Sequence, residues 1–332
     1  GKKIKDIPVN DDEVPIMLGK DSREAMEILN YVGLGEAFLF FRRYKELSDG
    51  QKYRYKLAKA LLNYDILFFD EFCSNLDRVT AKVVAYNFSK ACRKYKKTLI
   101  VAASQDDILE DLNPDVVIRV DIPSYERRKV KKKECSLLKE ITIEEGTSKD
   151  WKLFKKYHYR SGKITAVYKI FVAKYKGQKI GIIVYSYANP KVTRPIKDIH
   201  YKDVKTITRV VVLPPFRGIG LGVKLIKETM DKVEAKLIES VAVMAKYNPF
   251  FEKAGFQRYP IEEKHEKFLS FLRSLGFNDI KDEEENRRVL RRIKNKETLI
   301  EEIKKYFGKV EDDIAKQLTK TKLPATYFYI LK

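Results

Sequence analysis

The sequence predicts an α/β protein with two domains, a partial parallel α/β domain over residues 1–135 and an α+β domain over residues 136–332. Three observations support this division. The chain has 332 residues, which is long enough for two hydrophobic cores. Apolar strand and helix patterns alternate between residues 64 and 120. Charge is also uneven, with 28 basic and 26 acidic residues up to position 150, and 40 against 21 afterwards.

The first half opens with helical patterns. Asp21 or Ser22 is the expected N-cap of a helix that ends near the glycines at 33–35, with apolar residues at helical spacing: Ala25, Ile28, Leu29 and Val32. Residues 36–62 are expected to be helical, and 64–120 to alternate between strand and helix. The basic run at 127–133 indicates a linker or a phosphate-facing strand edge.

The second half begins with a strand pattern. Residues 164–174 and 179–187 predict a hairpin around Gly177, and 206–213 predict a buried strand that leads into a helix. Residues 261–320 are charged and helical, with two apolar faces, and predict a helical insertion before a last strand at 324–331. The two faces consist of Phe268, Leu272 and Leu275, and of Leu299, Ile303 and Phe307.

Several classes of protein are disfavoured by composition. No apolar run approaches 18 residues and no signal-peptide pattern is present, so we expect a cytoplasmic location. Three cysteines without a C-x-x-C pair argue against a disulfide framework or a zinc site. Three scattered histidines form no metal-binding pattern, and we therefore expect no metal site.

A glycine-rich turn joins the predicted strand at 206–213 to the following helix. Its residues are Arg217, Gly218, Ile219, Gly220, Leu221 and Gly222. Backbone N–H groups at a helix N-terminus are unpaired and face the positive end of the helix dipole, which suits a pyrophosphate. Glycines at 220 and 222 would let the backbone approach the phosphates closely. A dinucleotide-binding turn would look similar, but no nucleotide-binding second strand is evident around Glu239.

The sequence V-x-P-x-x-R-x-x-G-x-G that ends at Gly222 resembles the acetyl-CoA pyrophosphate loop of the GNAT acetyltransferase superfamily. Residues 248–256 (NPFFEKAGF) resemble the second signature of that superfamily. The resemblance implies acetyl-CoA as cofactor, held by the turn at 217–222, by Asn248 and Phe251, and by backbone groups of Val210, Val211, Val212 and Leu213. It also implies transfer of the acetyl group to an amine.

The catalytic residues are less clear from the resemblance. Family members often supply a tyrosine as general acid at the position that Phe251 occupies here, so the usual acid is missing. Tyr247, one helical turn earlier, could substitute for it, or could be an ordinary packed tyrosine. His158 lies in a polar and aromatic cluster and could act as a base, contact the substrate, or be structural.

The first half resembles part of an ABC-type ATPase. The pentapeptide at 47–51 is close to the LSGGQ signature, with Ser48, Gly50 and Gln51 in the matching places. Residues 66–71 resemble a Walker B strand, in which Asp70 would order magnesium and Glu71 would polarise water. Asp77 ends a D-loop-like segment, and Gln105 stands where the family has its switch histidine.

The phosphate-binding loop of such an ATPase is missing. No G-x-x-x-x-G-K-[ST] is present, because Val14 stands where the first glycine is needed before Gly19 and Lys20. Without a nest of backbone N–H groups we expect no autonomous ATPase activity. We expect ATP and magnesium to bind only if the phosphate loop is supplied elsewhere. The combination of halves resembles an archaeal family of ATPase–acetyltransferase fusions, and we expect a possible homodimer through the ATPase-like half.

Residues 151–200 carry 12 basic residues and one acid, interleaved with aromatics. This pattern suits phosphate contact and base stacking, although a solvated basic face would look alike. The residues expected to contact nucleic acid are Lys155, Lys156, Arg160 and Lys163.

The leading functional hypothesis is an N-acetyltransferase acting on an RNA base amine in tRNA or rRNA. A protein lysine or N-terminal acetyltransferase and a non-catalytic nucleic-acid-binding platform remain open. The lack of an evident carboxylate or tyrosine acid–base pair favours a base amine, which is already neutral.

Overall fold

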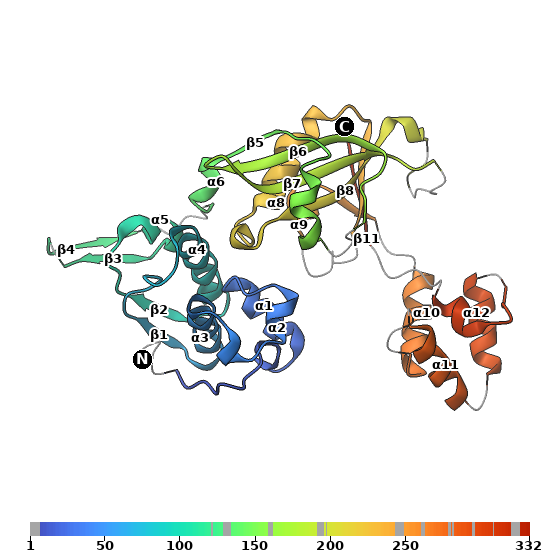
Figure 1. Ribbon diagram of the computed structural model, residues 1–332, viewed down its shortest axis with the longest axis horizontal. Helices are drawn as coiled ribbons and strands as arrows, with labels where there is room; N and C mark the ends of the chain where they lie inside the picture. Colours follow the sequence, from blue (N-terminus) through green and yellow to red (C-terminus); the bar gives the residue numbers. More distant parts are fainter. Residues whose placement is uncertain are drawn as a thin grey trace. The chain divides into compact units, whose positions relative to one another are not determined.

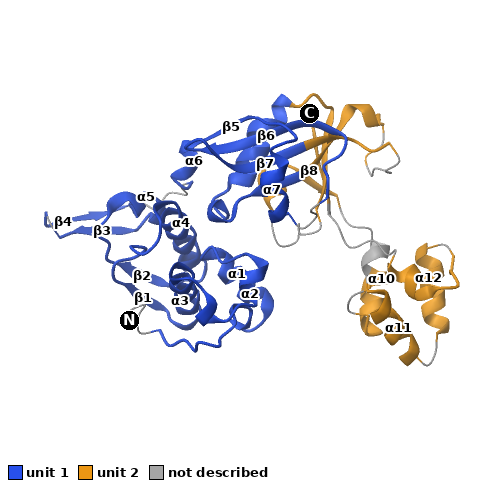
Figure 2. Ribbon diagram, in the orientation of Figure 1, with its two compact units in different colours: residues 1–184, 209–232 blue, residues 185–208, 233–332 orange. Residues whose placement is uncertain are grey.

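Figure 1 shows the computed structural model. It describes residues 7–120, 122–128, 134–158, 162–190, 196, 198–242, 249–259, 263–277, 280, 282–293, 296–307, 309–319 and 326–332. The chain divides into two compact units, coloured in Figure 2: residues 1–184 with 209–232, and residues 185–208 with 233–332. The predicted domain boundary near residue 135 lies inside the first unit.

The first unit begins with capped helices. Asp21 is the N-cap of α1 (Ser22–Tyr31), because its carboxylate accepts a hydrogen bond from the Glu24 N–H at 2.8 Å. A short α2 (Ala37–Phe40) follows, and then α3 (Asp49–Asn63). Ser48 and Gln51 form a capping box at the start of α3, which satisfies two backbone N–H groups.

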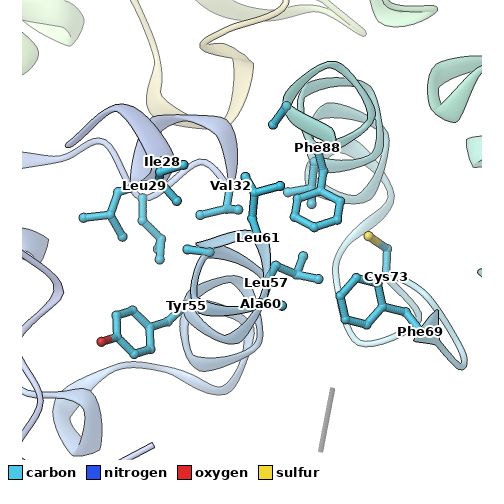
Figure 3. Packing of buried hydrophobic residues seen from close by; sticks show 14 of the residues in the cluster. Ile28, Leu29, Val32, Tyr55, Leu57, Ala60, Leu61, Phe69, Cys73 and Phe88 are labelled. Atoms are coloured by element: carbon cyan, nitrogen blue, oxygen red, sulfur yellow. The ribbon is translucent and has the colours of Figure 1, made fainter. Parts of the chain in front are cut away.

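A parallel strand–helix–strand unit follows these helices. Strand β1 (Ile66–Phe69) pairs with β2 (Thr98–Val101), and α4 (Arg78–Lys94) connects them. Leu67 and Phe69 point into the core, where Figure 3 shows Phe69 near Phe88 of α4 and Leu57 of α3. The opposite face of β1 is open, with Ile66 54% exposed. The predicted strand at 66–71 is confirmed in shorter form, and β2 lies in the region 64–120 that was predicted to alternate between strand and helix.

The remaining elements before the large sheet are short. A 3₁₀ turn (Asp106–Ile108) leads into α5 (Leu109–Leu112), and β3 (Val116–Arg119) pairs with β4 (Ser124–Arg127) as a hairpin. Most of the basic run predicted at 127–133 lies outside the described residues. Helices α6 (Leu137–Glu140) and α7 (Trp151–Phe154) flank β5 (Ile141–Glu145).

The large sheet has seven strands in the order β10-β11-β9-β8-β7-β6-β5. Its further strands are β6 (Val167–Tyr175), β7 (Gln178–Tyr187), β8 (Val204–Val212), β9 (Leu237–Ala242), β10 (Gln257–Tyr259) and β11 (Thr326–Leu331). The predicted hairpin is confirmed, although its first strand begins at 167 rather than 164. Lys176 and Gly177 both have positive φ, as a two-residue type I′ turn requires.

Two helices accompany the second half of this sheet. Helix α8 (Leu221–Thr229) follows β8, and α9 (Phe250–Lys253) precedes β10. The predicted strand at 206–213 is observed at 204–212, one to two residues earlier. The last strand is described over Thr326–Leu331, and the rest of the predicted strand, residues 324 and 325, lies outside the described residues.

The helical insertion lies between β10 and β11, as expected. It contains α10 (Glu263–Ser274), α11 (Glu283–Arg292), α12 (Glu297–Phe307) and α13 (Ile314–Thr319). The two predicted apolar faces pack into one hydrophobic core that includes Phe268, Leu272, Leu299 and Ile303. Among the described residues, no helix is long and apolar enough to cross a membrane.

Candidate functional site

The glycine-rich turn has the geometry of a helix N-terminus with a close backbone approach. Strand β8 ends at Val212, a 3₁₀ turn covers Pro214–Phe216, and α8 begins at Leu221 with Gly220 as its N-cap. Gly218 and Gly220 have φ of +83° and +100°, which is the left-handed region that favours glycine. Ile219 and Leu221 are buried and fasten the turn, while Gly218 and Gly220 are exposed. This geometry can present backbone N–H groups of the first turn of α8 to an anion.

The same turn packs against α4 of the ATPase-like half. The Asn87 side chain, 3% exposed, donates its Nδ2–H to the Arg217 carbonyl at 3.4 Å. A Cβ at position 218 would lie 2.6 Å from Asn87 Nδ2, so this glycine is needed for packing. Sequence reasoning gave no specific reason for Gly218, since its partner lies far away along the chain.

Arg217 also serves the turn itself. Its Nε–H donates to the Val212 carbonyl at 3.0 Å, which ties the start of the turn to the end of β8. Burial lowers the pKa of the Arg217 guanidinium, and the nearby Glu36 carboxylate opposes that shift. An arginine nevertheless remains charged in proteins, so Arg217 contributes one positive charge to the turn.

In the second unit, β8 and β9 pair as parallel strands over a short distance. The pairing joins Val204–Thr206 to Leu237–Glu239. Past this point the Ser240 hydroxyl donates to the Ile207 carbonyl at 3.0 Å, while β8 continues to Val212. The backbone pairing of β8 with β9 thus ends partway along β8.

Glu239 stands at the last of these backbone pairs and was not assigned a catalytic role from the sequence. Its side chain is 4% exposed. One carboxylate oxygen accepts from the Thr206 hydroxyl at 2.8 Å, and the other from the Tyr327 hydroxyl at 2.7 Å. The available signal was a single glutamate in the apolar strand pattern LIESVA, but its partners come from β8 and β11.

The residues expected around the cofactor tail are only partly described. Tyr247 and Asn248 lie outside the described residues. Phe251 is 3% exposed and packs against Phe256 and Phe328, with ring centroids 5.4 and 5.1 Å away. Its position is that of a core residue, and its contact with the cofactor stays a prediction.

His158 follows the 3₁₀ turn Lys155–Tyr157 and is half-buried. Its ring lies 5.9 Å from the Trp151 ring in an edge-on arrangement, and the Arg209 guanidinium lies 5.6 Å from the same ring. This geometry makes His158 part of an aromatic and cationic cluster beside β8.

The basic residues expected to contact nucleic acid are exposed where they are described. Lys155, Lys156 and Lys163 are all exposed, and the Lys156 ammonium lies 5.0 Å from the Tyr157 ring centroid. Arg160 lies outside the described residues. The three lysines can therefore meet a polyanion without displacing core packing.

In the ATPase-like half, the motif residues have local structural roles. Ser48 and Gln51 cap α3, Asp77 caps α4 by accepting from the Thr80 N–H at 3.0 Å, and an added Cβ at Gly50 would meet Leu76 at 3.3 Å. Asp70 and Glu71 are exposed just after β1, and Glu71 has a φ of +50°. Gln105 is exposed at the start of a 3₁₀ turn.

The segment before α1 does not form a phosphate loop. Residues Pro15–Met17 form a 3₁₀ turn where such a loop would need a preceding strand, and Gly19 leads directly to the Asp21 cap. Across the described parts of the chain, no group of three or more His, Cys, Asp or Glu side chains could hold a metal ion.

Residues 166–258 match the family model described as "Acetyltransferase (GNAT) domain". This segment is similar in sequence to GNAT acetyltransferase domains. The match covers β6–β10, and with them the glycine-rich turn and the end of the β8–β9 pairing. It confirms the fold class predicted for the second half.

Similar solved structures include a GNAT family acetyltransferase from Elizabethkingia anophelis with acetyl-CoA bound, 19% identical, covering 36% of this chain and 78% of that one, with a TM-score of 0.28. A Bacillus subtilis acetyltransferase in complex with CoA is 13% identical, covering 58% of this chain and 98% of that one, with a TM-score of 0.32.

Among curated proteins, the phosphonates import ATP-binding protein PhnC of Lactococcus lactis subsp. lactis is 39% identical over 84 residues. That alignment covers 25% of this chain and 33% of the relative, and the subsp. cremoris protein gives the same figures. The chain thus spans about a third of the length of these relatives. The similarity is therefore to one part of an ATP-binding protein.

Proposed function

We propose that this protein transfers the acetyl group of acetyl-CoA to an amine, and that the amine belongs to RNA. The observation that carries the transferase assignment is the GNAT domain match, which contains the strand, glycine-rich turn and helix of residues 204–229. A helix N-terminus capped by the left-handed Gly220 suits a pyrophosphate, because a glycine has no side chain that would keep an anion away from the backbone N–H groups.

Most of the residues that would hold acetyl-CoA come from one continuous segment of the chain. Backbone groups of Val210–Leu213 would bind the pantetheine arm as an added strand would, and the turn at 217–222 would bind the pyrophosphate. Acetyl-CoA supplies a thioester carbonyl that an amine nitrogen can attack. Backbone N–H groups beside that carbonyl would stabilise the negative charge that develops on its oxygen.

RNA is favoured as acceptor by charge. The chain beyond residue 150 carries 40 basic and 21 acidic residues, and Lys155, Lys156 and Lys163 stand exposed near the Trp151 cluster. A polyanion would relieve the mutual repulsion of these charges. The sequence showed no evident carboxylate that could act as a general base, and this favoured an amine that is already neutral. Glu239 is such a carboxylate, so the charge of the chain is now the argument for RNA.

A protein amine is the second candidate acceptor, and the Glu239 observation favours it. A lysine amine has an ordinary pKa of about 10.4, so it needs a group that accepts its proton near neutral pH. A carboxylate buried in the acetyltransferase sheet could have that role.

For the ATPase-like half we propose a supporting role without nucleotide hydrolysis. Asn87 of α4 donates a hydrogen bond to the backbone of the glycine-rich turn, so α4 helps to hold the turn in its conformation. Residues 48–51 and 77 are engaged in helix capping and packing, which a platform requires as much as an ATPase does.

The deciding experiment uses labelled acetyl-CoA with total cellular RNA and, in parallel, with total cellular protein. Label that enters the RNA fraction and is released by nuclease supports the proposal. Label in protein selects the second candidate. No label in either fraction, together with acetyl-CoA binding by calorimetry, would leave a non-catalytic platform.

A further inference from the structure

Tyrosine side chains gather on one side of strands β9, β10 and β11 in the second unit, where β10 forms an edge of the sheet. In the antiparallel registers Tyr259 of β10 pairs with Tyr327 of β11, and Tyr327 pairs with Val241 of β9. Directly paired residues lie on the same side of a sheet, and so do residues two positions apart in one strand, which adds Tyr329. These four residues form what we call the tyrosine face.

The rings of the tyrosine face make a row across two neighbouring strands. The Tyr259 and Tyr327 ring centroids are 6.4 Å apart, with the rings nearly perpendicular. The Tyr327 and Tyr329 centroids are 6.2 Å apart, with the rings tilted by 31°. Three aromatic rings therefore lie close together on one side of the sheet.

The tyrosine face is partly open to solvent, whereas the other side of the same strands is packed. Val241 is 56% exposed and Tyr259 is 38% exposed. On the other side, Phe328 is buried and stacks on Phe251 of α9 at a centroid distance of 5.1 Å. Exposed aromatic and apolar side chains that gather in one patch mark an interaction surface. The tyrosine face is therefore the side of these strands that can meet a partner.

The central ring of the row is held in one orientation. The Tyr327 hydroxyl donates to the Glu239 carboxylate at 2.7 Å, and this carboxylate also accepts from the Thr206 hydroxyl at 2.8 Å. Glu239 itself is 4% exposed, so its charge lies below the surface. A ring that is already fixed loses little freedom when a ligand stacks on it. Tyr327 is therefore preorganised for stacking.

Charge decides which ligand suits the tyrosine face. Strands β9, β10 and β11 contain two charged residues, the buried Glu239 and the exposed Arg258. Lys332 is exposed directly after β11, and the chain beyond residue 150 carries 40 basic and 21 acidic residues. Aromatic rings on a sheet in basic surroundings suit a single-stranded nucleic acid, because unpaired bases stack on the rings while the cations meet the phosphates.

We propose that the tyrosine face binds unpaired bases of RNA by stacking. The inference rests on the proposed function, because it takes the acceptor to be RNA. It assigns to this face the recognition of a single strand, such as a loop or an end, rather than of a duplex. Bases in a duplex stay stacked on one another, so their faces do not reach an aromatic side chain.

The first test removes one ring and leaves every charge in place. Tyr259→Leu in the full chain should weaken binding of poly(U) by roughly 5- to 150-fold, which corresponds to about 1–3 kcal/mol for a stacked base. Tyr259→Phe keeps the ring and should bind within about twofold of the unsubstituted protein. Tyr201→Leu is the matched control and should leave the affinity unchanged, because Tyr201 is 37% exposed but belongs to a 3₁₀ turn outside the sheet.

Two further measurements separate stacking from charge. Stacking releases no counterions, so Tyr259→Leu should leave the slope of log affinity against log salt unchanged. Inorganic polyphosphate offers phosphates without bases, and Tyr259→Leu should bind it as the unsubstituted protein does. Equal losses of affinity for poly(U) and for polyphosphate would overturn the inference, since the ring would then act through charge or through the fold.

Photo-crosslinking decides if Tyr259→Leu does not fold, because it uses the unsubstituted protein. Poly(U) that contains 4-thiouridine should form adducts on Tyr259, Tyr327 or Tyr329, which mass spectrometry of the peptides would locate. Adducts confined to other parts of the chain would contradict the proposal.

The remaining outcomes separate this inference from the proposed function. If the protein acetylates RNA and Tyr259→Leu keeps its affinity for poly(U), the tyrosine face is not the binding surface although the proposed function stands. If Tyr259→Leu loses affinity for poly(U) but labelled acetyl-CoA puts no label into RNA, the tyrosine face binds RNA and the proposed acceptor is wrong. If light scattering shows a dimer that Tyr259→Leu dissociates, with an unchanged affinity for poly(U), the face joins two copies of the chain and the inference falls.

Discussion

Two glycines with the same backbone strain but different surroundings allow the glycine-rich turn to be tested. Gly220 has a φ of +100°, and an added Cβ would meet only Leu138 Cδ1 at 3.8 Å, an ordinary contact. Gly177, in the β6–β7 hairpin, has a φ of +80°, and an added Cβ would meet nothing within 4 Å. Alanine at either position therefore incurs the left-handed backbone cost without a steric clash, about 1–2 kcal/mol.

Both alanine variants should lose about 1–2 kcal/mol of unfolding free energy in denaturant titrations, but only Gly220→Ala should lose acetyl-CoA affinity. At position 220 the Cβ and the shifted backbone both intrude on the N-terminus of α8, where the pyrophosphate is expected. Calorimetry should show at least a tenfold rise in Kd, equivalent to about 1.4 kcal/mol, and no binding for Gly220→Tyr. Gly177→Ala should bind acetyl-CoA as the unsubstituted protein does.

Two results would refute this reasoning. If Gly220→Ala lost stability as Gly177→Ala does but kept its affinity for acetyl-CoA, the turn would not be the pyrophosphate site. If both variants lost affinity equally, the effect would come from general destabilisation rather than from the turn.

Three further predictions concern the rest of the chain. Asn87→Ala should weaken acetyl-CoA binding severalfold in calorimetry, because the Arg217 carbonyl loses a donor, and an unchanged Kd would remove the bracing role of α4. The purified chain should release no phosphate from ATP above background, since Glu71 has no phosphate loop to work with; turnover that Glu71→Gln abolishes would contradict this. Charge reversal at Lys155, Lys156 and Lys163 should reduce the slope of log RNA affinity against log salt by about 2. Each single-strand phosphate contact contributes about 0.7 to that slope, and three such contacts would be lost. Reversal of three exposed lysines elsewhere, Lys20, Lys96 and Lys304, is the control, and an equal loss of slope there would favour a non-specific effect.

The features that the sequence predicted well depend on residues close together along the chain. Asp21, one of the two predicted caps, caps α1 through the N–H three residues later. The β6–β7 turn needs only the two positive-φ residues at 176 and 177. The strand, glycine turn and helix around Gly220 were likewise predictable, because left-handed glycines and helix N-termini are local features.

Other features depend on residues far apart in the sequence, and only the tertiary structure decided them. Gly218 is needed because Asn87 packs against it, and the Arg217–Asn87 hydrogen bond spans 130 positions. Tyr327 meets Glu239 across 88 positions, so no spacing in the sequence could indicate that pair. The two apolar faces of the insertion were evident separately, but their union in one core follows from packing. Periodicity shows which side of a helix or strand is apolar, whereas its partner is set by the way that the whole chain excludes water.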